Sequence, residues 1–289
     1  YGNFSVSMLT WPTAFSRDDE NFVNAIFERV LEYRPIISQR LAAANANGVL
    51  DPATGFYNGY GPTNQDVVIP AFLAAYTGKS PDKVRLDPFR SVPVPNWDIT
   101  YDGLTKLPVF AKLFRTFTLK NSYRSAFNIA NFQTNLLYVP GGNEVDAAGN
   151  FIPQRQISVI TVQEVMRPLA SFDATLKNGL IAKFEYNRDR NLSLSMTNYQ
   201  VTEVRGKEYV IGTGYRFKNV KFPFSIGGSV PKSDLNLRVD LTWRDNATVI
   251  RKMEEHLNQV TAGQNVLSIK TSADYVLNQR LNVRAFYER

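Results

Sequence analysis

Apolar and polar side chains alternate with a period of two along most of the chain after Phe114, a pattern typical of β-strands whose two faces differ. The purest stretch is 234–244, where every odd position is apolar and every even position is polar. The same alternation, with more exceptions, recurs at 116–124, 192–197, 208–217, 267–274 and 280–287. The sequence therefore predicts an all-β fold, with an antiparallel meander of about nine to ten strands over 109–289.

Short polar segments between these stretches predict the turns. Asn178-Gly179 is the strongest signal, because a type I′ hairpin turn needs positive φ at two successive residues and these residue types adopt it easily. The segments 188–191 and 204–207 are also predicted as short turns. Longer links are predicted at 140–153 and 218–233, which contain several glycines.

The alternation by itself does not identify the environment, since a soluble antiparallel sheet also has one apolar and one polar face. Two features favour a membrane barrel. Strands of ten or eleven residues, as in 234–244, are long enough to cross a bilayer, and residues 114–289 contain no amphipathic helix that could form a second layer. A third is that aromatic residues lie toward the expected strand ends, as in interfacial girdles: Trp11, Phe217, Trp243, Tyr275 and Tyr287.

In such a barrel the apolar faces contact lipid and the polar faces line a water-filled interior. The candidate lumen-facing residues all belong to the purest strand: Asp234, Asn236, Arg238, Asp240 and Arg244. Their mixed charges fit a hydrated pore wall, and a structural ladder of ion pairs between strands explains them equally well.

The first third of the chain is mixed. A strand is expected over 1–11 and a helix over 19–33, where apolar residues recur every three to four positions; Pro35 is expected to end or kink that helix. Together with the aromatic, glycine-rich loop 46–66 it belongs to a helix/loop excursion over 12–108, which we expect to be extramembrane or lumenal. Its apolar residues are expected to form one cluster that narrows or caps the pore mouth: Phe22, Ile26, Val30, Val67, Ile69 and Phe72.

The composition of the chain excludes most kinds of catalytic and metal-binding chemistry. The chain has no Cys and only one His, which excludes thiol catalysis and cysteine metal sites and makes a Ser-His-Asp triad improbable. Acids at 18–20 fit a helix start, and 254–256 (Glu-Glu-His) fits a hairpin tip, better than either fits a metal site. The net charge of +7 comes from interleaved cations and anions rather than a basic stripe, which disfavours nucleic-acid binding. We predict no catalytic residue, cofactor or metal.

Four long stretches resemble one known family. They are IPAFLAAYTGKSP (69–81), LPVFAKLFRTFTLKNSYRSAFNIANFQTNLLY (107–138), RNLSLSMTNYQVTEVRGKEYVIGTGYRFKNV (190–220) and residues 235–289. They are similar to the C-terminal part of the SprA (Sov) family, the outer-membrane translocon of the type 9 secretion system of Bacteroidota.

The resemblance implies a segment of a very large single-chain barrel in the bacterial outer membrane. That barrel passes folded cargo proteins to the cell surface, and the family is linked to gliding motility. The implied partners are a PorV-like outer-membrane barrel, a periplasmic plug protein, cargo and membrane lipid. Since the family's proteins are several times longer and this chain begins without Met, a cleaved piece or an excerpt is expected.

A function of another class stays open: a soluble or surface-attached β-rich module that binds carbohydrate through the aromatic residues of loop 46–66. Detergent dependence distinguishes the two. A binding module should stay monodisperse in buffer, whereas a barrel segment with lipid-facing leucines and valines should aggregate.

Overall fold

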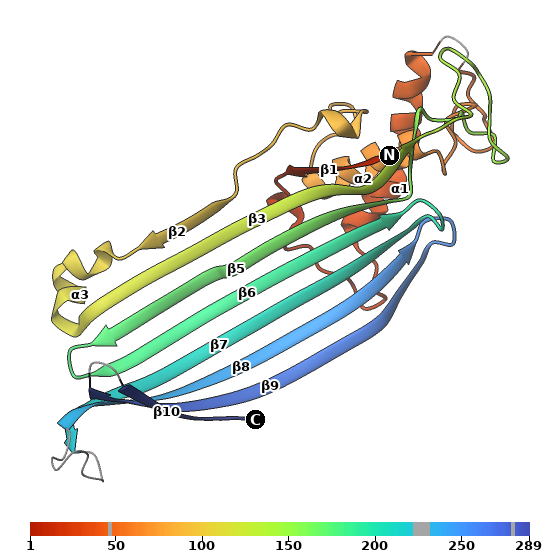
Figure 1. Cartoon of the computed structure of the whole chain (residues 1–289). Helices are drawn as coiled ribbons and strands as arrows, with labels where there is room; N and C mark the ends of the chain where they lie inside the picture. Colours follow the sequence, from red (N-terminus) through yellow and green to blue (C-terminus); the bar gives the residue numbers. More distant parts are fainter. Residues whose placement is uncertain (46–47, 222–231, 279–280) are drawn as a thin grey trace.

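The computed structural model describes residues 1–45, 48–221, 232–278 and 281–289. Its main feature is one antiparallel sheet of ten strands, in the order β1-β3-β5-β6-β7-β8-β9-β10, with β2 and β4 also paired to β3 (Figure 1). The strands are β1 (Gly2–Ser7), β2 (Trp97–Tyr101), β3 (Phe114–Thr134), β4 (Arg155–Ile157), β5 (Val159–Leu176), β6 (Leu180–Ser195), β7 (Gln200–Lys221), β8 (Lys232–Lys252), β9 (Leu257–Asn278) and β10 (Leu281–Glu288).

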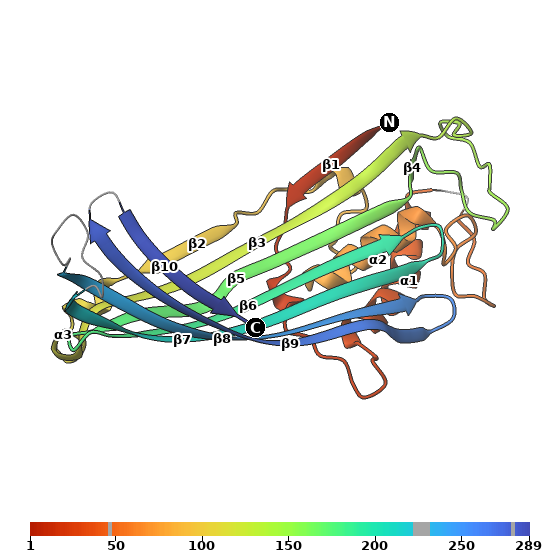
Figure 2. The same cartoon turned by 60° about the horizontal axis from the view of Figure 1, so that its bottom comes forward.

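The sheet is open. Among the described residues, the edge formed by β1 and β2 does not pair with β10, and Figure 2 shows the sheet curving without closing. The antiparallel, mostly β character predicted from the alternation is confirmed. Closure into a large barrel is not a feature of this chain by itself.

The long strands have 16 to 22 residues, not the ten or eleven that the alternation predicts. The predicted turns at 188–191 and 204–207 are the reason, because both segments lie inside strands, in β6 and β7. Three of their charged residues, Asp189, Arg190 and Arg205, form ion pairs with other parts of the fold. A hairpin turn at Asn178-Gly179 is confirmed, but it is not of type I′, because Gly179 has a positive φ (+96°) and Asn178 does not. Most of the predicted link 218–233 lies outside the described residues.

The first third contains the helices α1 (Ala25–Ala43), α2 (Gln65–Thr77) and α3 (Pro108–Leu113). The helix predicted at 19–33 begins later, because Asn24 caps α1 by accepting a hydrogen bond from the Ile26 amide (2.9 Å). It also continues through Pro35 to Ala43, so the prediction that Pro35 ends the helix is wrong. Ile37 and Ser38, both fully buried, keep the helix packed beyond the proline.

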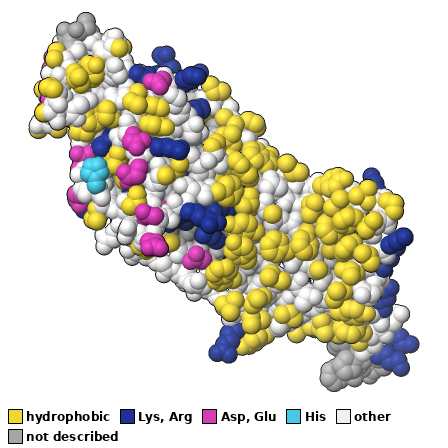
Figure 3. Space-filling view, turned by 180° about the vertical axis from the view of Figure 1, so that it is seen from behind, with side chains coloured by type: hydrophobic (Ala, Val, Ile, Leu, Met, Phe, Trp, Pro, Cys, Tyr) yellow, Lys and Arg dark blue, Asp and Glu magenta, His cyan; other side chains and the backbone are white. Residues whose placement is uncertain are grey.

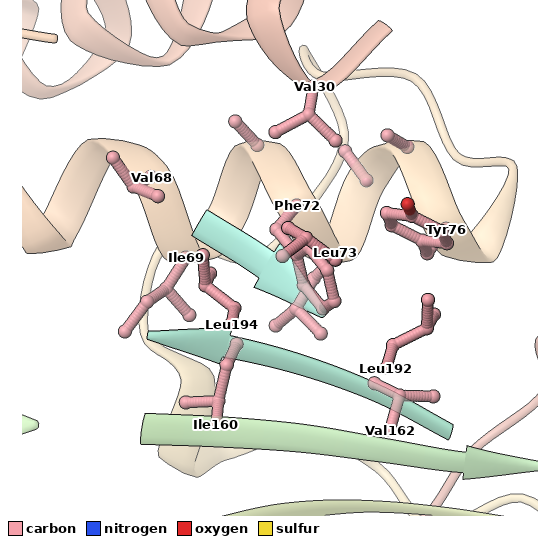
Figure 4. Close-up of a cluster of buried hydrophobic side chains, with 14 of the residues drawn as sticks. Val30, Val68, Ile69, Phe72, Leu73, Tyr76, Ile160, Val162, Leu192 and Leu194 are labelled. Carbon is pink, nitrogen blue, oxygen red and sulfur yellow. The ribbon is translucent and has the colours of Figure 1, made fainter. Parts of the chain in front are cut away.

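α1 and α2 pack together on the sheet at one end of the strands (Figure 4). Ten consecutive residues of α2, Val67–Tyr76, are buried between α1 and the strands. The expected cluster of Ile26, Val30, Val67, Ile69 and Phe72 is present in this core. Phe22 is the exception, because it lies before α1 at φ +59° with 43% of its surface exposed.

The helices cover the face of the sheet that also carries the apolar residues of β8. Leu192 and Leu194 of β6 contact this helix core. β6 pairs with β7, and β7 with β8, without a register shift from Leu180 to Ser195 and from Gln200 to Phe217, so the face of each residue follows from its position. α1 and α2 therefore lie on the face opposite the candidate lumen-facing residues, and the expected narrowing or capping of a pore mouth stays a prediction.

Candidate functional site

Three aromatic rings form a row across neighbouring strands in the middle of the sheet. Tyr186 of β6 stacks on Tyr209 of β7 (ring centroids 4.6 Å apart, interplanar angle 9°), and Tyr209 stacks on Trp243 of β8 (5.5 Å, 14°). In-register pairing holds the row, because Tyr186 is opposite Tyr209 and Tyr209 is opposite Trp243. Trp243 therefore lies well inside its strand, not at the end where the sequence places it.

On the side of this aromatic row away from the helices, the same face is apolar and bare. Val239 and Trp243 are each 44% exposed, although both belong to a paired strand inside the sheet. Figure 3 shows these side chains as a broad hydrophobic surface beside the charged, helix-covered half. We call it the apolar band; its large exposed members on β7, β8 and β9 are Ile211, Tyr215, Phe217, Leu237, Val239, Leu241, Trp243, Leu267 and Ile269.

The opposite face of the same strands is polar and contains ion pairs. Arg244 of β8 donates from Nε to Glu208 Oε2 of β7 (2.7 Å), and Asn187 of β6 donates to Glu208 Oε1 (2.9 Å). Farther along, Arg216 lies 2.7 Å from Asp234 across β7 and β8. Charges on this face thus neutralise one another locally instead of adding up to a field of one sign.

The five residues predicted to face a lumen all lie on this polar face of β8. Asp234 pairs with Arg216, Arg238 with Asp240 (3.2 Å) and Arg244 with Glu208, whereas Asn236 lies in register with Arg216 and Asp274. They do not converge on one point. The structure therefore gives a row of separate ion pairs, as in the ladder that the sequence left open, and the lumenal role stays a prediction.

Gly212 makes room for one of these pairs. It lies opposite Asp240 in register, and a Cβ at this position would collide with the Asp240 carboxylate. Gly212 and Gly214 thus allow the close approach of β7 and β8.

The helix-covered half of the apolar-band face contains buried charges, and only Asp18 among them was a candidate from the sequence, as an acid at a helix start; α1 begins later, at Ala25. Arg251 is 0% exposed, and its guanidinium donates to Glu203 (3.0 Å) and Asp18 (2.8 Å). Asp18 also accepts from Arg205 of β7 (2.6 Å). This chain of ion pairs fastens the segment before α1 to β7 and β8.

A second buried pair lies on β5 and β6. Arg190 lies 3.1 Å from Glu164, and both side chains are almost fully buried. Thr10 donates to Glu164 (2.6 Å), and Arg190 donates to the Thr13 carbonyl (2.8 Å). Burial, the main cause, raises the pKa of the nearby Tyr76 hydroxyl. The only sequence signal for these pairs is that their charged members interrupt otherwise strand-like segments.

Other candidates from the sequence have structural roles. Glu254, in the turn between β8 and β9, pairs with Arg34 of α1 (2.8 Å). In loop 46–66, Phe56 is buried and Tyr60 packs against Phe151 (5.1 Å between centroids), which leaves little aromatic surface there for stacking on a sugar. The described part of the chain holds no cluster of side chains suited to a metal ion.

None of the helices in the described ranges is both long and apolar enough to cross a membrane. Comparison with known proteins finds no family model and no curated protein that matches this chain. The class that the fold defines is therefore an open, mostly antiparallel β-sheet with a helical layer on half of one face.

Proposed function

We propose that the chain is part of the wall of a membrane-spanning β-barrel, with the apolar band against lipid and the polar face toward an aqueous interior. The interior passes folded proteins across the bacterial outer membrane, as the resemblance to the type 9 translocon suggests. The chain performs no covalent chemistry in this role.

The exposure of the two faces carries the proposal. A water-soluble sheet buries its apolar face, yet from Leu237 to Trp243 of β8 the apolar residues are the more exposed ones and the polar residues between them are partly shielded. The nine residues from Leu235 to Trp243 extend over eight steps, about 27 Å of strand, or about 21 Å across a bilayer at a tilt near 40°. Known barrels have an apolar band about 25 Å tall, bordered by aromatic rows.

The polar face supports a passage for proteins. Arg, Asp, Glu and Asn side chains there are paired with one another, so the surface is hydrated but has no large patch of one sign or of apolar residues to retain a cargo. A wide passage also needs closing elements, which supports a plug protein and a PorV-like barrel as partners.

The open edges support a larger wall. β10 covers only the half of β9 from Lys270 onward, so the outer edge of β9 before that residue has no described strand beside it. Unpaired strand edges do not persist in a bilayer, because each unsatisfied peptide group costs several kcal/mol there. Further strands, or another chain, are therefore expected at both edges.

A cysteine pair on β8 tests the orientation, and the absence of native cysteines makes single labels unambiguous. Val239→Cys and Asp240→Cys are neighbours on opposite faces. With an environment-sensitive dye on each, lipids that carry a nitroxide in their acyl chains should quench the Val239 label, while a water-soluble quencher should reach only the Asp240 label. Equal access of the water-soluble quencher to both labels would contradict the proposal and favour a soluble binding module.

Photo-crosslinking in secreting cells tests the cargo. A photoreactive amino acid in place of Asp240 should form crosslinks to exported proteins, and the matched change at Val239 should form crosslinks to lipid or membrane partners only. If export continues but no cargo is found in the Asp240 crosslinks, the transport role is wrong. The proposed membrane orientation is not affected by that result.

A further inference from the structure

A pocket of about 390 Å³ lies on the apolar-band face, where the segment 16–22 overhangs strands β6, β7 and β8. Its floor is formed by the strand residues that immediately follow the aromatic row on the helix side: Arg188, Lys207 and Asp245. Tyr186 and Tyr209 form one wall, and Arg17 and Phe22 belong to the overhanging segment. The pocket is thus open to solvent at the boundary between the charged half and the apolar band.

The pocket contains more unpaired positive than negative charge. The side chains of Arg17 and Lys207 are exposed and make no hydrogen bond or ion pair with any described residue. Arg188 donates to the Ala14 carbonyl and lies over the Phe15 ring (5.1 Å), so its charge also lacks a carboxylate partner. These three cations are available to an anion.

Most acids of the pocket have partners of their own and do not neutralise these three cations. Asp18 is bound by Arg205 and Arg251, and Asp19 accepts hydrogen bonds from the amides of Asn21 and Val23 (2.8 Å each). Asp245 is the remaining acid and lies opposite Lys207 in register. One unpaired carboxylate among three unpaired cations matches a phosphate with a nearby amine better than a lone multivalent anion.

The surroundings match a lipid rather than a free anion. Beyond Tyr209 and Trp243 the same face continues directly into the apolar band, through Ile211 and Leu241. Phe22, 43% exposed, also lines the pocket and adds apolar surface to it. A ligand that fills the pocket with its charged group can therefore lay a chain of some length along exposed apolar side chains.

We propose that this pocket binds the phosphate-bearing headgroup of a membrane phospholipid, whose acyl chains lie on the apolar band. Arg17 and Lys207 contact the phosphate, Arg188 supports it, and Asp245 faces the amine of a phosphoethanolamine headgroup. The proposal rests on the proposed membrane orientation and adds a fixed lipid at one level of the wall.

The test uses the full-length protein in nanodiscs of phosphatidylethanolamine and phosphatidylcholine, followed by release of the protein and native mass spectrometry. The expected result is one retained phospholipid, with phosphatidylethanolamine preferred. In the double variant Arg17→Gln/Lys207→Gln the bound fraction should fall by about fivefold for each charge removed. Lys252→Gln, an exposed cation at the far end of β8, should retain the lipid.

The outcomes are distinguishable. If the Val239 label is quenched by lipid nitroxides and the double variant still retains its lipid, the headgroup site is wrong and the membrane wall stands. If the Val239 label is not lipid-exposed, both proposals fall. If millimolar inorganic phosphate displaces the retained mass, or binds without any lipid, the pocket is a free-anion site and the lipid assignment is overturned.

Discussion

The two halves of one sheet face differ in a way that reverses the usual distribution of side chains. In the half under α1 and α2, charged residues are buried, with Arg251 at 0% exposure. In the bare half, large apolar residues are exposed, with Val239 and Trp243 at 44%. The same strand, β8, passes through both halves, so strand geometry cannot be the cause.

The comparison shows that each half is suited to a different covering. The helical layer satisfies buried charges through specific partners, since Asp18 and Thr10 reach Arg251 and Glu164 from the N-terminal segment. The bare half has few polar groups, such as the Thr213 hydroxyl, which donates to the Ile181 carbonyl (3.3 Å), and it needs mainly an apolar medium. Lipid provides such a medium without specific contacts, which is why the bare half supports a membrane wall and the covered half an extramembrane extension of it.

The largest effect is expected in the covered half. Arg251→Met leaves the buried Glu203 without its cation and Asp18 with only Arg205, which should destabilise the fold by about 3–5 kcal/mol. Denaturant titration in detergent or nanodiscs measures the loss. The neighbouring Lys252→Met removes only an exposed ion pair and should change the stability by less than about 1 kcal/mol. Equal effects of the two variants would mean that the buried network does not fasten the segment.

The bare half should respond next most strongly. Leu237→Arg or Val239→Arg puts a charge in the apolar band and should cost about 2–4 kcal/mol of assembly in a membrane. Arg238→Leu and Asp240→Leu, on the opposite face of the same strand, should be milder. Membrane-inserted yield after expression or refolding measures the difference, and equal tolerance on both faces would show that the assignment of the faces is wrong.

The boundary between the halves should show a smaller effect than either half. Tyr209→Leu keeps most of the apolar volume but removes the central ring of the aromatic row, which should cost about 0.5–1.5 kcal/mol. Ile211→Leu, one position deeper in the band on the same strand, is the matched control and should be close to neutral. If Ile211→Leu lowers the stability as much as Tyr209→Leu does, the aromatic row makes no particular contribution to stability.

The smallest effect concerns pH in the helical layer. Burial is the main cause that raises the pKa of Asp66 at the start of α2, so the folded state holds this proton more tightly than the unfolded chain. Stability should therefore fall as pH rises from the unfolded pKa of 3.8 to the raised folded value. Asp66→Asn should remove this part of the pH dependence. Unfolding curves of both proteins between pH 3 and 7 test it, and parallel profiles would contradict it.

The local alternation of apolar and polar residues predicted the sheet but not the length of its strands. The strict alternation in 234–244 predicted β8 and both of its faces, and Asn178-Gly179 predicted a hairpin turn that the structure contains. The segments 188–191 and 204–207 were misinterpreted as turns because charged runs normally face water. Arg190 and Arg205 instead lie in strands and pair with Glu164 and Asp18, which are distant in sequence.

The candidate site was also predictable only in part, because periodicity gives the face of a residue but not its partner on the next strand. Periodicity placed Asp234, Arg238 and Asp240 on one face, but it could not give Glu208 as the partner of Arg244, because that depends on the register between β7 and β8. The pocket beside the aromatic row could not be predicted from the sequence either, since it joins residues 16–22 to three strands far along the chain.

The sequence by itself determined the period of the strands, the separation of apolar from polar faces, and the absence of cysteine chemistry, because these follow from neighbouring residues and from composition. Only the tertiary structure decided which face the helices cover, where the aromatic row lies along the strands, and which charges are buried. Those features depend on strand register and on contacts between segments more than 150 residues apart, such as Thr10 with Glu164. Local propensity carries no information about such contacts, because packing between distant elements selects among conformations that are locally equivalent.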